Sequence, residues 1–133
     1  MRLKIVELGG LRPIVELLKS ENLDVAGKAA FLLACLALDS PVRLAIHILG
    51  GVECLLNLMK VEDKMVVDNA ALCLSQVVQH VEAKDELYRL HGIKILLEDG
   101  ILSDSVDVQE NSARAIAYAI ETEGNLKDLR RQM

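Results

Sequence analysis

The sequence predicts an all-α protein whose short helices stack as successive repeats into a solenoid. Hydrophobic residues make up 52% of the chain and aromatic residues only 2%. The core must therefore consist of Leu, Ile, Val and Ala, which suits helix-on-helix packing, whereas sheet sandwiches usually carry more Tyr, Phe, Trp and Thr. The chain also resembles itself at a spacing of 41 residues, and a pair of glycines recurs at that spacing.

The repeat is visible when the sequence is shifted along itself. Residues 8–37 then overlay residues 49–78, and ten of the thirty aligned positions are identical, where chance would give roughly two or three. In a third copy, residues 108–113 overlay residues 66–71 after a shift of 42, so one residue has been inserted. We predict a single array with repeats at about 1–40, 41–82 and 83–123, followed by the start of a further repeat at 124–133.

Each copy divides into three helices. The glycine pair, Gly9-Gly10 in the first copy, ends a short first helix, because glycine tolerates the positive φ that closes a helix and lets the next helix start almost at right angles. A second helix of about ten residues follows, and its apolar face is predicted to hold Ile14, Leu17 and Leu18.

A longer third helix is expected from about Val25 to Leu38, after a polar turn. Ala29 and Ala30 lie where neighbouring helices must pack tightly. Ser40 is predicted to cap the next helix, with Pro41 in its first turn. In the third copy, Asp107 and Glu110 have the spacing of a capping box at the start of the long helix.

The cysteines indicate a reducing compartment. Cys35, Cys54 and Cys73 are odd in number, lie in apolar runs and form no C-x-x-C pair. We predict that all three are reduced core thiols. The protein is therefore expected inside the cell, in the cytoplasm or the nucleus.

Charge and motifs exclude several classes of function. The net charge of −5 argues against nucleic-acid binding, which calls for a basic face, and charged residues interrupt every apolar segment before it reaches membrane-spanning length. The sequence contains no G-x-S-x-G, no H-E-x-x-H and no phosphate-binding glycine loop. Cys73 and His80 lack the further ligands that zinc needs. We predict no enzyme, no cofactor and no metal.

The repeat unit resembles the armadillo repeat. The resemblance rests on LGGLRPIVELLKS and DVAGKAAFLLACLA, which LGGVECLLNLMK and VVDNAALCLSQVV repeat, and it covers essentially the whole chain. HEAT repeats are the nearest alternative, but they usually have two helices and no glycine pair. The resemblance implies a right-handed superhelix of about three repeats, in which the third helices line a concave groove that binds extended peptides or partner helices.

Some members of this family bind peptides with a Trp and an Asn on each third helix. That pattern is absent here, so the resemblance does not predict binding of nuclear-localisation signals. The corresponding groove row, built from spacings of three and four on each third helix, would instead consist of Lys28, Phe31, Cys35, Asn69, Leu72, Gln76, Asn111, Arg114 and Tyr118.

We expect the amides of this row to meet a partner's backbone, while Phe31, Arg114 and Tyr118 select its side chains. Phe31 could instead be ordinary core filling. The expected function is that of a protein-binding scaffold for a protein or peptide partner. The alternatives are a spacer that stacks on further repeats or self-associates through its apolar ends, and a regulatory array attached to an enzyme in a longer parent chain.

Overall fold

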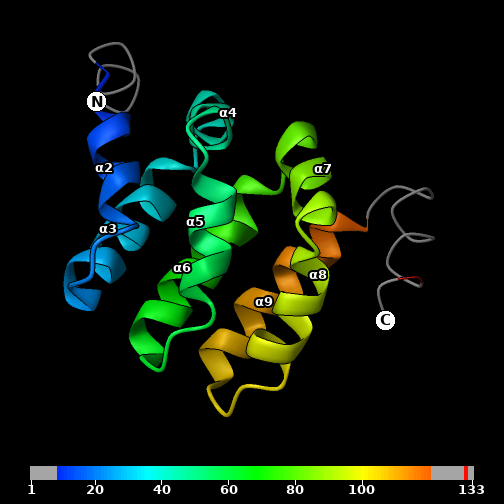
Figure 1. Cartoon of the computed structure of the whole chain (residues 1–133). Helices are drawn as coiled ribbons and strands as arrows, with labels where there is room; N and C mark the ends of the chain where they lie inside the picture. The colour runs from blue at the N-terminus through cyan, green and yellow to red at the C-terminus, as the bar shows by residue number, and fades with distance from the viewer. Residues whose placement is uncertain (1–8, 121–130, 132–133) are drawn as a thin grey trace.

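The computed structural model describes residues 9–120 and residue 131 (Figure 1). Within these residues the regular structure is entirely helical, as predicted. The predicted first helix near Met1 and nearly all of the segment 124–133 lie outside the described residues. The helices are α2 (Leu11–Leu17), α3 (Leu23–Leu36), α4 (Ser40–Ile48), α5 (Gly51–Leu58), α6 (Lys64–Val77), α7 (Val81–Arg89), α8 (Gly92–Ile95), the π-helix η1 (Leu96–Ile101) and α9 (Val106–Ala119).

The helices form successive repeats that lie in a row (Figure 1). α2 and α3 belong to the first repeat, α4, α5 and α6 to the second, and α7, α8, η1 and α9 to the third. α6 packs along both α3 and α9. The three long helices therefore form one layer, and α2, α5 and α8 lie in front of it (Figure 1).

The glycine pairs act as predicted. Gly50 has a φ of 83° and lies in the left-handed region, and the axes of α4 and α5 meet there at 83°. Gly9 has a φ of 71° at the same point of the first repeat. In the third repeat His91, with a φ of 58°, occupies this position, so a residue with a Cβ adopts the left-handed conformation there.

The second and third helices differ from their predicted bounds. α2 has seven residues rather than about ten, and Leu17 is 46% exposed although it was placed on the apolar face. Leu18 is buried as predicted. α3 begins at Leu23 and not at Val25, because Asn22 caps it: its side chain accepts hydrogen bonds from the backbone N–H groups of Asp24 and Val25 at 3.0 and 3.4 Å.

Two predicted caps are wrong. Ser40 is already the first residue of α4, and Asp39 precedes it at the N-cap position. α9 begins at Val106, since the Ser105 hydroxyl accepts a hydrogen bond from the backbone N–H of Val108 at 3.4 Å. Asp107 consequently lies inside the first turn and forms no capping box. The serine two residues earlier was the stronger cap.

The inserted residue of the third copy is absorbed by η1. The backbone N–H of Leu102 donates to the carbonyl oxygen of Leu97, five residues earlier, at 3.1 Å. One residue added to an α-helix widens a turn into such a π-helical bulge. The flanking helices keep their register, and α9 packs on η1 and α6.

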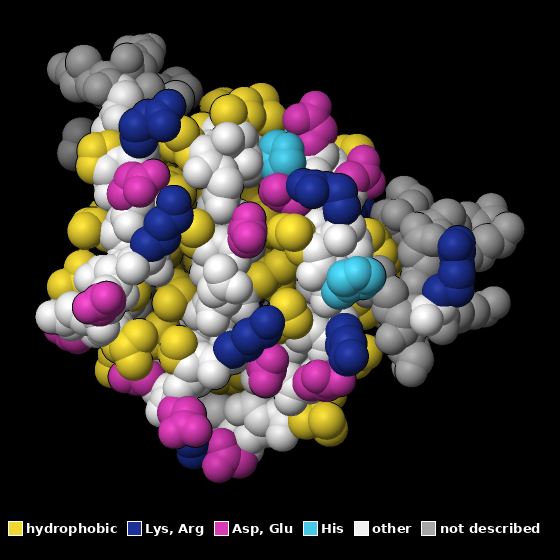
Figure 2. Space-filling model, viewed as in Figure 1, with side chains coloured by type: hydrophobic (Ala, Val, Ile, Leu, Met, Phe, Trp, Pro, Cys, Tyr) yellow, Lys and Arg dark blue, Asp and Glu magenta, His cyan; other side chains and the backbone are white. Residues whose placement is uncertain are grey.

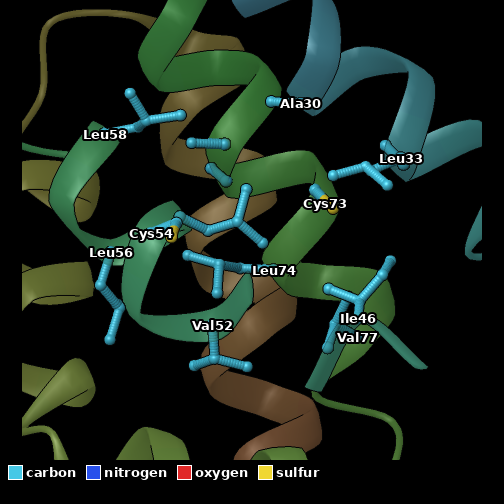
Figure 3. Close-up of a cluster of buried hydrophobic side chains, with 14 of the residues drawn as sticks. Ala30, Leu33, Ile46, Val52, Cys54, Leu56, Leu58, Cys73, Leu74 and Val77 are labelled. Carbon is cyan, nitrogen blue, oxygen red and sulfur yellow. The ribbon is translucent and has the colours of Figure 1, made fainter. Parts of the chain in front are cut away.

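The core runs through all three repeats and is aliphatic. Figure 3 shows part of it, and the residues labelled there belong to the first two repeats. Ala29 and Ala30 are buried, as predicted. Cys54 and Cys73 are also buried, but Cys35 is exposed, so the prediction of three core thiols is wrong for Cys35. Burial raises the pKa of the Cys54 and Cys73 thiols; Lys19 partly opposes this at Cys54. Both buried cysteines are therefore protonated packing residues.

Candidate functional site

The three long helices present one continuous surface, which we call the third-helix face. It contains the nine residues predicted for the groove row, because residues three or four positions apart share one side of a helix. α6 packs against α3 and α9, so the side chains of neighbouring repeats lie next to one another.

The first repeat contributes an exposed aromatic side chain to this face. Phe31 is 51% exposed, so the alternative that it fills the core is wrong. Lys28 is exposed as well, and its ammonium group lies 3.1 Å from the carboxylate of Asp24 on the preceding turn. Cys35 is exposed one turn further along α3. This part of the face offers an aromatic ring beside a surface ion pair.

Two amides of the face link neighbouring repeats. Asn69 on α6 donates through Nδ2 to the carbonyl oxygen of Gly27 on α3, at 3.0 Å. Asn111 on α9 donates through Nδ2 to the carboxylate of Asp68 on α6, at 2.8 Å. These donors, expected to meet a partner's backbone, are engaged between helices in this structure. Burial raises the pKa of Asp68, and the bond from Asn111 opposes that rise.

The remaining residues are polar groups around a half-buried apolar strip. Leu72 and Tyr118 pack against the core and keep part of their surface exposed. Gln76 accepts a hydrogen bond from Gln79 at 3.1 Å, and Arg114 donates to the Asn111 side-chain oxygen at 3.3 Å while remaining exposed. The face therefore combines apolar surface with an amide and a guanidinium group.

Residues at the start of each third helix extend this face. Asp24, Met65 and Asp107 occupy equivalent positions, four residues before Lys28, Asn69 and Asn111, and all three are exposed. They were not among the residues predicted for the groove row, although the same spacing rule places them on the face. With Asp68 and Glu110 nearby, carboxylates exceed the cationic groups of Lys28 and Arg114. The face is consequently acidic on balance.

The opposite face, formed by α2, α5 and α8, carries scattered charges of both signs (Figure 2). At its edge His47 on α4 lies 2.9 Å from the Glu86 carboxylate on α7, which Arg89 also contacts at 3.0 Å. This cluster ties the first helices of two repeats together. Among the described residues, no three His, Cys, Asp or Glu side chains are arranged to hold a metal ion.

Over residues 9–120 no single helix has the length and apolar character to cross a membrane. α4 and α5 are long and apolar enough only when they are taken together, and the chain bends by 83° between them.

Solved structures with the same arrangement of helices include engineered proteins. An engineered protein solved by the Northeast Structural Genomics Consortium aligns with a TM-score of 0.91 and 29% identity, over 98% of this chain and 32% of its own length. A second engineered protein from the same consortium aligns with a TM-score of 0.86 and 28% identity, over 92% of this chain and 51% of its own. This chain thus spans about a third of the length of the first and about half of the length of the second.

A designed armadillo repeat protein in complex with the peptide (KR)4 aligns with a TM-score of 0.91 over 98% of this chain and 56% of its own length. Its sequence identity is 19%, so this likeness concerns the fold alone. No protein-family model and no curated protein matches the sequence.

Proposed function

Because the chain has the fold of an armadillo-repeat solenoid, we propose that it is a protein-binding scaffold that holds an extended peptide on the third-helix face. The observation that carries this proposal is the exposed Phe31 on α3 together with the half-buried Leu72 at the equivalent position of the adjoining helix α6, on a surface that α3, α6 and α9 form together. An exposed aromatic ring beside apolar surface is typical of a binding hot spot. Designed armadillo repeat proteins of similar structure include one in complex with a peptide.

The role proposed for each residue in peptide binding follows from its contacts. Phe31 and Leu72 hold an apolar side chain of the peptide, and the half-buried Tyr118 on α9 offers further apolar surface. Asn69 and Asn111 fix the spacing of the helices through their inter-repeat bonds, so Gln76 is the amide that meets the peptide backbone. The carboxylates of Asp107 and Glu110 favour a peptide that carries Lys or Arg, since opposite charges steer association.

A random dodecapeptide library displayed on phage tests this proposal with the whole chain as bait. Selected peptides are expected to be enriched in Lys, Arg and apolar residues. The double variant Gln76→Ala/Arg114→Ala is expected to change the affinity for individual selected peptides at least fivefold, because it removes an amide and a charge from the third-helix face. Fluorescence anisotropy with labelled peptides measures the affinity, and circular dichroism checks that the helix content is unchanged.

The matched control is Asn57→Ala/Lys94→Ala, which removes an amide and a cation from exposed positions on α5 and α8, on the opposite face. It should leave every affinity within twofold of the unsubstituted chain. Two results count against the proposal: a library that yields no peptide above background, and selected peptides whose affinity responds to the control variant but not to the third-helix variant.

A further inference from the structure

The two ends of the helical row expose side chains at positions that are buried elsewhere in the array. Leu32 on α3 is 44% exposed, whereas the equivalent Cys73 on α6 is completely buried where α6 adjoins α3 (Figure 3). Leu17 on α2 is 46% exposed, whereas the equivalent Leu58 on α5 is 5% exposed. Both positions are covered in the second repeat because the first repeat packs on them. The first repeat therefore presents an apolar surface, which we call the leading face.

The other end of the row shows the complementary pattern. Ala113 and Ala117 on α9 are exposed. Their equivalents on α6, Ala71 and Ser75, are completely buried. Small residues at these positions let the next third helix approach closely, as Ala30 on α3 does towards α6 (Figure 3). We call this surface, at the third-repeat end of α9, the trailing face.

Exposure at the two ends differs from ordinary surface exposure of apolar residues. Leu102 is 78% exposed, but its equivalents Lys19 and Lys60 are exposed too. That position faces solvent in every repeat, so a neighbouring repeat does not cover it. Leu17 and Leu32 are exposed only in the repeat whose neighbouring side is open.

The polar link between repeats is also matched at the two ends. Within the array, the donor position (Asn69, Asn111) bonds to the acceptor position of the preceding repeat (Gly27, Asp68) at 3.0 and 2.8 Å. The same register assigns Lys28 to the donor position on the leading face and Glu110 to the acceptor position on the trailing face. Both are exposed. A head-to-tail contact between two chains would thus place an ammonium group against a carboxylate.

From this continuity with the interface between repeats, and from the charge match, we infer that a second copy of this chain docks head to tail, with its leading face on the trailing face of the first. The contact repeats the α3–α6 and α6–α9 packing between two molecules. It is heterologous, so it leaves one leading and one trailing face open and extends the array instead of closing it. The inference does not require peptide binding, because its apolar contacts come from the ends of the row; it shares only Lys28 and Glu110 with the third-helix face.

Sedimentation velocity over a range of concentrations tests the inference. The unsubstituted chain is expected to form larger species as its concentration rises. Leu32→Asp blocks the leading face and Ala113→Arg blocks the trailing face, so each variant alone should stay monomeric. An equimolar mixture of the two should form a one-to-one dimer, because each supplies the face that the other lacks. Leu102→Asp is the control and should associate like the unsubstituted chain.

The ionic contact has its own test. Lys28→Glu and Glu110→Lys should each weaken association at least fivefold, and the double variant Lys28→Glu/Glu110→Lys should restore it. Thermal melts establish that every variant is folded. A chain that stays monomeric at all concentrations overturns the inference. So does association that survives Leu32→Asp, or that is lost in Leu32→Asp and unaffected by Ala113→Arg, since the latter result describes a symmetric contact between two leading faces.

Discussion

Ser112 is a buried polar residue on α9 that stands where the first two repeats have Ala29 and Ala70. Its hydroxyl group has no hydrogen-bond partner among the residues that the structure describes. A buried hydroxyl without a partner costs free energy because it has lost its hydration. The position illustrates how one repeat can depart from the others at a single atom while its helix keeps the same packing.

We predict that Ser112→Ala raises the free energy of unfolding by about 1 kcal/mol. The matched control is Ser75→Ala on α6, where the buried hydroxyl donates to the carbonyl oxygen of Leu72 at 2.6 Å. Losing that bond should lower the free energy of unfolding by about 0.5–1 kcal/mol. Urea denaturation of both variants measures the two changes. Equal destabilisation by both substitutions would show that the Ser112 hydroxyl is bonded.

His91 adopts a left-handed conformation at the position that glycine fills in the other two repeats. We predict that His91→Gly stabilises the chain by about 1 kcal/mol, because it removes the steric cost of a Cβ at positive φ. The reverse substitution at the equivalent site, Gly50→Ala, should destabilise it by about 1–2 kcal/mol. Thermal melts check both signs. A lower melting temperature for His91→Gly would mean that contacts of the imidazole outweigh the backbone cost.

At the scale of the helices, η1 shows how the array tolerates an insertion. Gly100 lies on this π-helix, and a Cβ built there would collide with the side chain of Ser112. The extra residue is therefore accommodated by a wider turn and by the absence of a side chain at the point of closest approach. Neither feature disturbs the neighbouring helices, which explains why the repeat remains recognisable on both sides of the insertion.

We predict that Gly100→Ala destabilises the chain by about 1–3 kcal/mol, as overpacking of a core does. Glu98→Ala, at an exposed position of the same π-helix, should change stability by less than about 0.5 kcal/mol. Chemical denaturation compares the two variants. If both substitutions had equal, small effects, α9 would not press against Gly100 as the structure has it.

Helix bounds were less predictable than helix type, for a local reason. The stretch around Val25 has the periodicity of a helix. The residue at which the helix begins depends on which side chain accepts hydrogen bonds from its first backbone N–H groups. Asn22 and Ser105 do so. A polar turn rich in capping residues offers several candidates, so sequence alone placed the starts of α3 and α9 two residues too late.

At the scale of the whole molecule, periodicity was the strongest signal in the sequence. The overlay of residues 8–37 on residues 49–78 predicted the helical solenoid, because equivalent positions in a solenoid have equivalent surroundings. It failed where the surroundings differ between repeats. Leu17 is exposed and its equivalent Leu58 is buried, since only the second repeat has a described neighbour on that side.

The placement of the third-helix face followed from helix geometry, but its internal bonds did not. The bond from Asn69 to Gly27 depends on the distance between α3 and α6. The spacing of residues within one helix does not predict that distance. Phe31 was ambiguous for a related reason. Whether an aromatic residue is buried depends on the helices packed around it, and at this position α6 leaves half of the ring exposed.

Site-specific photo-crosslinking tests the central claim, that partners bind on the third-helix face, most directly. Phe31, replaced by p-benzoylphenylalanine, should crosslink to a peptide selected from the library, and the same photoreactive residue in place of the exposed Asn57 on α5 should not. Mass spectrometry of the irradiated mixtures identifies the products. Efficient crosslinking from position 57 with none from position 31 would contradict the account.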